Sequence, residues 1–172
     1  VDFYRAEELF EKAKFSAAQE EFRVYMKTHE SANHPFYVKA KYYDALCALY
    51  LYHQDAEKLL LAFLAEYPES IYRQEVYFEL GRYYYRKNLH NKAIDWFTQV
   101  EVFDLSEDKK PEYYFKLGYS NFRKSKLTKA RDAFYEIIEV ESQYKDPALY
   151  YYSHIAYSQK NYEVALKGFR KL

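Results

Sequence analysis

Large apolar side chains recur along this chain at steps of three and four residues. That spacing lines up one face of an α-helix, whereas a strand would alternate at every second residue. The clearest stretches are 76–88 and 112–125, which are rich in Tyr, Phe and Leu. The pattern predicts an all-α chain of paired helices, at 2–14 with 16–29, 35–51 with 54–66, 70–87 with 90–103, 111–124 with 127–140, and 147–159 with 162–172.

Residues that favour helix ends lie between these segments. Asp146 and Pro147 supply an N-capping side chain followed by a proline at the first helical position. Asn88 and Asn161 fall at the short turns between the two helices of a pair. The local backbone preferences therefore agree with the predicted helix pairs.

A second pattern repeats in the later helix of each pair. A ring, His or Leu is followed by two residues, an alanine, three more residues and a large apolar side chain. The alanines lie 38, 37, 37 and 35 residues apart, at Ala18, Ala56, Ala93, Ala130 and Ala165. A period of this length predicts a helical solenoid of about five helix-turn-helix repeats. The repeats are approximately 1–33, 34–69, 70–106, 107–144 and 145–172.

We expect these repeats to form one solenoid domain over 1–172. The chain starts at Val1 without an initiator Met or a signal-like apolar segment. We therefore expect it to be part of a longer protein from which any targeting sequence is missing.

The third and fourth repeats carry a motif that resembles the tetratricopeptide repeat (TPR). Its residues are Leu80, Gly81, Tyr84, Ala93 and Phe97, and again Leu117, Gly118, Ala130 and Phe134. The resemblance implies a right-handed α-α superhelix in which the first helix of each repeat lines a concave face. We expect the small residues of the first helices to lie opposite the alanines. Asp44 departs from the motif, because a small residue is expected at its position.

The stretch 63–88 is also similar to TPR segments of bacterial envelope proteins, of the outer-membrane assembly lipoprotein and Tol-Pal coordinator types. A Tyr-Pro-x-Ser link between two helices carries this likeness. It implies a periplasmic or outer-membrane-associated protein of a Gram-negative bacterium, and a cytoplasmic location is the alternative.

The resemblance also implies a binding groove, because TPR grooves are lined by the first helices. Carried onto this sequence, the partner-binding positions are Phe78, Arg82, Tyr85, Arg86, Phe115, Lys116, Tyr119, Phe122, Arg123, Tyr150, Tyr151, His154 and Tyr157. Tyr and Arg dominate the binding energy of protein interfaces, and Arg can clamp a carboxylate. The expected function is a scaffold that binds a peptide segment or partner protein, with an acidic group near the arginines.

Net charge and hydropathy limit the classes of partner that the chain can bind. Lys and Arg number 26 and Asp and Glu number 26, so the net charge is zero. A neutral chain lacks the general attraction that non-specific nucleic-acid or anionic-membrane binding requires. No run approaches the roughly 18 apolar residues of a membrane-spanning helix, so we expect no direct membrane insertion.

The sequence contains none of the motifs that would indicate an enzyme or a cofactor site. The glycines are too few for a phosphate-binding loop, and neither H-E-x-x-H nor paired cysteines occur. Cys47 is expected to be a small buried hydrophobe. His53 and His90 occupy equivalent turn positions and are assigned to packing, and Asn121 is interpreted as a core amide. We expect no catalysis, cofactor or metal.

Two other functions compete with the scaffold. The chain could be a structural spacer that self-associates through its last helix, since solenoids need a polar capping helix at their ends. Binding of single-stranded RNA, by analogy with pentatricopeptide repeats, would use rings and arginines to stack bases. The zero net charge and the glutamates Glu75, Glu79 and Glu112 argue against RNA.

Overall fold

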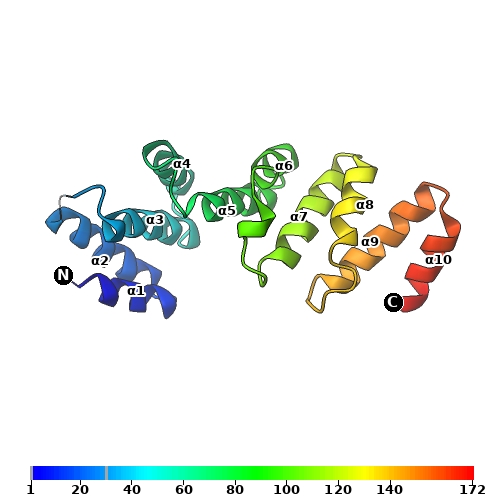
Figure 1. The fold of residues 1–172 in the computed structure, drawn as a ribbon, viewed down its shortest axis with the longest axis horizontal. Coiled ribbons are helices and arrows are strands. Elements are labelled where there is room, and N and C mark those ends of the chain that lie inside the picture. Colours follow the sequence, from blue (N-terminus) through cyan, green and yellow to red (C-terminus); the bar gives the residue numbers. More distant parts are fainter. Residues whose placement is uncertain (1, 30) are drawn as a thin grey trace. The chain divides into compact units, whose positions relative to one another are not determined.

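The computed structural model describes residues 2–29 and 31–172, and in these residues the regular structure is entirely helical. The helices are α1 (Phe3–Glu11), α2 (Phe15–Thr28), α3 (Pro35–Tyr50), α4 (Ala56–Glu66), α5 (Arg73–Arg86), α6 (His90–Phe97), α7 (Lys110–Arg123), α8 (Leu127–Tyr135), α9 (Lys145–Ser158) and α10 (Tyr162–Lys171), with a short 3-10 helix at Val102–Asp104 (Figure 1). The chain divides into two compact units, residues 1–76 and 77–172, which we call the N-terminal and C-terminal units. The prediction of an all-α chain of helix pairs is confirmed.

The N-terminal unit is held together by stacked rings and small side chains. In its core, Phe3 lies parallel to Phe36 with ring centroids 4.7 Å apart, and Phe22 lies parallel to Tyr43 at 5.3 Å. α2 packs against α3, and α3 packs against α4. Burial of such rings supplies most of the driving force for packing.

An ion pair explains the Asp44 departure in this unit. The Asp44 side chain is about one-tenth exposed, and its carboxylate accepts a hydrogen bond from Arg23 Nε at 2.8 Å. The Asp44 carbonyl also accepts from Gln19 Nε2 at 3.1 Å. Gln19 and Arg23 lie four residues apart on α2 and so face the same side of that helix. Asp44 thus joins α3 to α2 through polar contacts.

The C-terminal unit continues the same construction with α6 to α10 and the later part of α5. α7 packs on α8 and α9 packs on α10, while α6 contacts α7 and α8 contacts α9. Phe97 is fully buried, and Tyr113 donates a hydrogen bond from its hydroxyl to the Phe97 carbonyl at 3.0 Å. Successive hairpins in this unit therefore share one continuous core.

The alanine register predicted from the sequence is confirmed. No more than 2% of the surface of each alanine is exposed, at Ala18, Ala56, Ala93, Ala130 and Ala165. The small residues opposite them have a more specific role than the sequence indicated. A Cβ atom added to Gly81 would lie 2.4 Å from the Phe97 ring, and one added to Gly118 would lie 2.9 Å from the Phe134 ring. The glycines accommodate the rings that follow the alanines by four residues.

Two helices end five or six residues earlier than predicted. α6 ends at Phe97 rather than at 103, and α8 ends at Tyr135 rather than at 140. After each end the backbone tightens, because the Val100 amide donates to the Phe97 carbonyl at 3.1 Å and the Ile137 amide donates to the Phe134 carbonyl at 3.1 Å. Val100 and Ile137 are still buried. These turns therefore bury the apolar side chains that a longer helix would otherwise bury.

The five turns within the hairpins share one geometry. Each contains a non-glycine residue with φ between 56° and 63°, at Ala13, Tyr52, Asn88, Ser125 and Lys160. In each turn the next amide donates back across five residues, as Lys126 does to the Asn121 carbonyl at 2.9 Å. This is the Schellman arrangement, which satisfies carbonyls at a helix end.

Candidate functional site

Rings from three successive first helices form a continuous row in the C-terminal unit. We call it the aromatic row, and its members are Tyr85 of α5, Tyr119 and Phe122 of α7, and Tyr150, Tyr151 and His154 of α9. Ring centroids lie 5.9 Å apart for Tyr85 and Tyr119, 5.6 Å for Tyr119 and Tyr151, 5.1 Å for Tyr151 and Phe122, and 6.0 Å for Phe122 and His154. The contacts fix these side chains relative to one another.

The row is partly accessible to solvent. Tyr150 is 49% exposed and His154 is exposed, while the remaining members are half-buried. Tyr157, at the end of α9, is 59% exposed and lies 5.4 Å from Tyr162. A partner could therefore contact several pre-positioned rings with little loss of side-chain entropy.

Two other predicted residues belong mainly to the core. Phe78 is 1% exposed and packs near Phe97, at a centroid distance of 6.2 Å. Phe115 packs between Phe134 and Tyr144, at 5.7 and 5.3 Å. The sequence alone could not separate these rings from the accessible ones, because all of them share the same helical spacing.

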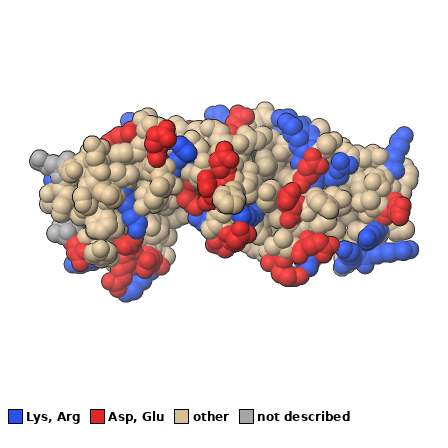
Figure 2. All heavy atoms as spheres, viewed as in Figure 1, with Lys and Arg blue, Asp and Glu red and all other residues tan. Residues whose placement is uncertain are grey.

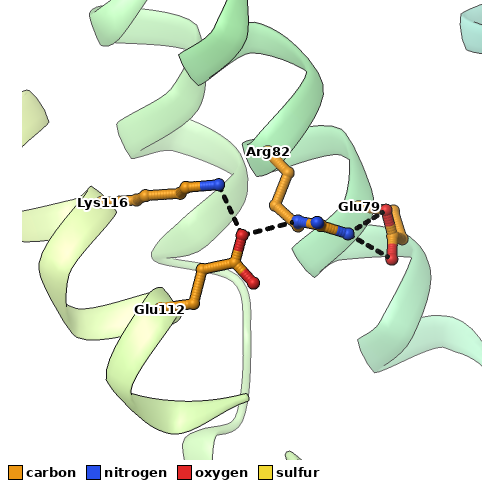
Figure 3. A network of polar contacts seen from close by, with 4 residues as sticks. All are labelled: Glu79, Arg82, Glu112 and Lys116. Carbon is orange, nitrogen blue, oxygen red and sulfur yellow. Dashed lines mark hydrogen bonds and ion pairs between the residues drawn. The ribbon is translucent and has the colours of Figure 1, made fainter. Parts of the chain in front are cut away.

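Arg82 and Lys116 are engaged by carboxylates of the chain itself (Figure 3). Arg82 Nη1 lies 3.1 Å from both carboxylate oxygens of Glu79, and Arg82 Nε lies 2.9 Å from Glu112 Oε1. Lys116 pairs with the same oxygen of Glu112. The positive charges of Arg82 and Lys116 thus face the negative charges of Glu79 and Glu112. The Glu79 side chain is only 4% exposed. The acidic group that the sequence led us to expect near Arg82 is thus already present in the chain.

Arg123 is in a different position. It is exposed at the end of α7, where its Nη1 donates to the Tyr119 hydroxyl at 3.2 Å. Within residues 2–29 and 31–172 it forms no ion pair. A carboxylate from a partner could pair with this guanidinium without displacing another anion. Arg86 is also exposed, at the end of α5.

Burial raises the pKa of two tyrosines of the row, Tyr85 and Tyr151. Desolvation, with smaller contributions from Tyr119 and other neighbours, raises the pKa of Tyr85 to about 12. Burial also raises the pKa of Tyr151, against a lowering effect of Arg123. Both hydroxyls are protonated at neutral pH, as in an ordinary tyrosine, and the raised pKa extends this to more alkaline solution, so they can donate hydrogen bonds to a partner.

The residues singled out for other chemistry lie in packed surroundings. Cys47 is fully buried, and desolvation followed by the Asp44 charge raises the pKa of its thiol to about 12. Its predicted burial is confirmed, and the thiolate is not accessible at neutral pH. His90 is buried with its Nδ1 3.1 Å from Ser120 Oγ, and Asn121 is buried with its amide donating to the Leu117 carbonyl at 2.9 Å.

The described part of the chain offers neither a metal-binding cluster nor a membrane-spanning helix. Among the residues with described positions, no three His, Cys, Asp or Glu side chains are gathered in a way that could hold a metal ion. None of the helices in that part combines the length and the apolar character needed to cross a bilayer.

Comparison with known proteins identifies the fold. No family model and no curated protein matches the sequence. Among solved structures, a crystal structure of MamA is similar with a TM-score of 0.70 at 18% identity, covering 96% of this chain and 91% of MamA. MamA of AMB-1 gives 0.71 at 16% identity, with coverages of 99% and 95%. A putative kinesin light chain of Podosopora anserina, with nearly identical TPR-like repeats, gives 0.67 at 12% identity, with coverages of 98% and 90%. The chain therefore has an α-α solenoid fold of the TPR type.

Proposed function

We propose that this protein is a scaffold that binds a segment of another polypeptide on the aromatic row of its C-terminal unit. The observation that carries the proposal is the row itself, in which rings on α5, α7 and α9 contact one another and remain partly exposed. Rigid aromatic side chains provide large contact area at low entropic cost, which is why they are enriched at binding hot spots.

Arg123 gives the surface a preference for acidic groups. Its guanidinium carbon lies 5.9 Å from the Tyr119 ring centroid, beside the middle of the row. A partner carboxylate there would meet a charge that no acidic side chain in the described structure neutralises. We place the acidic contact at Arg123 rather than at Arg82, which already pairs with Glu79 and Glu112.

Site-specific photocrosslinking tests the proposal. A photoreactive phenylalanine analogue would replace Tyr157, which is exposed and follows His154 of the row by three residues on α9, and the crosslinked protein would be identified from native cells. The matched control replaces Tyr135, which is 62% exposed on α8 and outside the row. We expect a specific partner at Tyr157 and not at Tyr135. Equal crosslinking at both positions would refute the proposed surface.

The identified partner then allows an affinity measurement. Arg123→Ala and Tyr150→Ala should each weaken binding of the purified partner about tenfold, since each removes a contact of the kind that dominates interfaces. Tyr135→Ala should leave the affinity within about twofold. Unchanged affinity in both test variants would show that the partner binds elsewhere.

Self-association is a second candidate, favoured by the exposed face of α10. Leu166 is 52% exposed and Phe169 is 40% exposed, although Phe134, at the position equivalent to Phe169, is fully buried. If α10 pairs with a second copy, light scattering should report dimers that Leu166→Glu converts to monomers. A monomer at high concentration would exclude this candidate.

We also propose, from the sequence resemblance alone, that the protein acts in the envelope of a Gram-negative bacterium. Cell fractionation of the native protein tests this location. Recovery with the cytoplasmic fraction would refute it.

A further inference from the structure

Cations gather at one edge of the C-terminal unit, where the turns within the hairpins lie. We call this the basic edge, and its members are Lys87, Lys92, Arg123, Lys124, Lys126 and Lys129. All six are exposed, and in the part of the chain that the structure describes none of them forms an ion pair. Lys160 occupies the matching turn between α9 and α10. Residues 83–94 and 117–131 contain no Asp or Glu.

Direct contacts show that the turns adjoin one another. His90, which begins α6, approaches Ser120 of α7 through its Nδ1 at 3.1 Å. Arg131 of α8 donates to Gln159 Oε1, at the end of α9, at 2.7 Å. The three turns therefore form one edge. Figure 2 shows blue side chains together on the upper margin over the α7–α8 hairpin.

The opposite edge of the unit has a different arrangement. There Lys110 pairs with Glu107, Lys145 pairs with Glu141, and Lys171 pairs with Glu139. Figure 2 shows red and blue side chains adjoining each other on the lower margin. The chain as a whole is neutral, so the uncompensated charge of the basic edge arises from the distribution of charges and not from their total.

Helix stability does not explain the cations of this edge. Lys and Arg at a helix C-terminus are favourable, which accounts for Arg123 and Lys124 at the end of α7. Lys92, Lys126 and Lys129 lie instead at the beginnings of α6 and α8, whose first turns contain no acidic residue. A cation there opposes the helix dipole and costs stability. Lys92 lies over the Tyr84 ring, with its Nζ 5.2 Å from the ring centroid, and this contact offsets part of the cost. Lys126 and Lys129 are therefore better explained by binding than by folding.

We infer that the basic edge binds an acidic stretch of the polypeptide partner whose remainder contacts the aromatic row. The inference rests on the proposed function, because Arg123 of the basic edge contacts Tyr119 of the aromatic row and so connects the two surfaces. Six exposed cations can pair with several carboxylates of a flexible segment.

The surrounding charges favour a short acidic segment over a long polyanion. Asp95 on α6 and Asp132 on α8 each lie five residues beyond the first residue of their helix, or about 7.5 Å along its axis. Glu163 occupies the first turn of α10. These anions lie within about a Debye length of the edge at physiological salt, so they would repel a nucleic acid or an anionic bilayer extending over the unit.

Charge reversal at two lysines provides the test. Lys126 is the N-cap of α8, and Lys129 is the third residue of that helix. The control pair occupies the same positions in two other helices: Lys14 is the N-cap of α2, and Lys58 is the third residue of α4. K126E/K129E and K14E/K58E therefore change the net charge equally and place acidic groups at equivalent helix starts. Circular dichroism should show both variants to be as stable as the wild type or more so.

The probe is a short peptide of alternating Glu and Tyr carrying an uncharged fluorophore, with its Gln-for-Glu counterpart as the reference. We expect the acidic peptide to bind the wild type at low salt, to lose about tenfold in affinity in K126E/K129E, and to keep its affinity within about twofold in K14E/K58E. Equal affinities for both double variants, or for both peptides, would overturn the inference.

Two further outcomes separate this inference from the proposed function. If the crosslinked partner depends on Tyr150 but not on Lys126 and Lys129, the scaffold function holds and the basic edge is not its acidic site. If a single-stranded oligonucleotide or a vesicle of anionic lipid binds with the same lysine dependence while the acidic peptide does not, the inference of a polypeptide ligand is wrong.

Discussion

Replacing Arg82 by alanine should destabilise the C-terminal unit substantially. The substitution leaves the Glu79 carboxylate, which is 4% exposed, without the guanidinium that holds both of its oxygens at 3.1 Å. Removing one partner of a buried ion pair typically costs about 3–5 kcal/mol. Arg82 itself is 34% exposed, so solvent screens part of the interaction, and we expect a loss of about 2 kcal/mol.

Trp96 provides the assay. It is the one tryptophan of the chain and lies on α6, where its ring is 6.0 Å from Tyr77, so its fluorescence reports unfolding of the C-terminal unit. Urea titrations would compare the wild type with Arg82→Ala, Glu79→Gln and the double variant. If the negative charge of the buried Glu79 carboxylate causes the loss, Glu79→Gln should restore about 1 kcal/mol in the Arg82→Ala background.

A matched arginine controls for lost side-chain packing. Arg131 is 35% exposed in the same unit, and its guanidinium donates to the neutral Gln159 side chain at 2.7 Å. Arg131→Ala should therefore cost only about 1 kcal/mol, because no buried charge is left behind. Equal losses in Arg82→Ala and Arg131→Ala, or no rescue by Glu79→Gln, would refute the reasoning.

Three further predictions concern the hairpins. Ala93→Leu should lower the free energy of unfolding by about 1–3 kcal/mol through overpacking, and an unchanged urea midpoint would contradict the alanine register. Ser125→Gly should raise the free energy of unfolding by about 0.5 kcal/mol, because φ is 58° at this position and glycine adopts such a backbone without strain. A lower free energy of unfolding in the same urea titration would refute this explanation. Burial, followed by the charges of Arg123 and Lys124, lowers the pKa of His90 below its ordinary 6.5, so the unfolded chain takes up this proton more readily. Stability should fall as the pH drops through about 6.5, and His90→Gln should reduce that fall; an identical pH profile in the variant would disprove it.

The sequence predicted the fold because its strongest signal is local and repeated. The alanine spacing identified the hairpins, and every alanine of the series is buried. The early ends of α6 and α8 could not be predicted, since Val100 and Ile137 continue the helical pattern while facing the core from a turn. An apolar period records which side chains are buried and not which backbone geometry carries them.

The candidate site was predicted less completely, because its chemistry depends on contacts between helices. Arg82 and Arg123 both lie in a first helix rich in rings, yet Glu112, thirty residues from Arg82, pairs only with Arg82. A sequence read one helix at a time does not contain that pairing. The lysines at the start of α8 are evident in the sequence. Because cations at a helix N-terminus are unfavourable, the sequence alone could have identified them as candidate binding residues.

The shared turn geometry has a consequence for how such a surface can change. Each hairpin is closed by main-chain hydrogen bonds that are the same whether the left-handed residue is Ala, Tyr, Asn, Ser or Lys. Side chains at these corners can therefore be exchanged without altering the connection between helices. Mutation can adjust the charge at the turns of each unit independently of its architecture, which allows recognition to diverge while the scaffold is preserved.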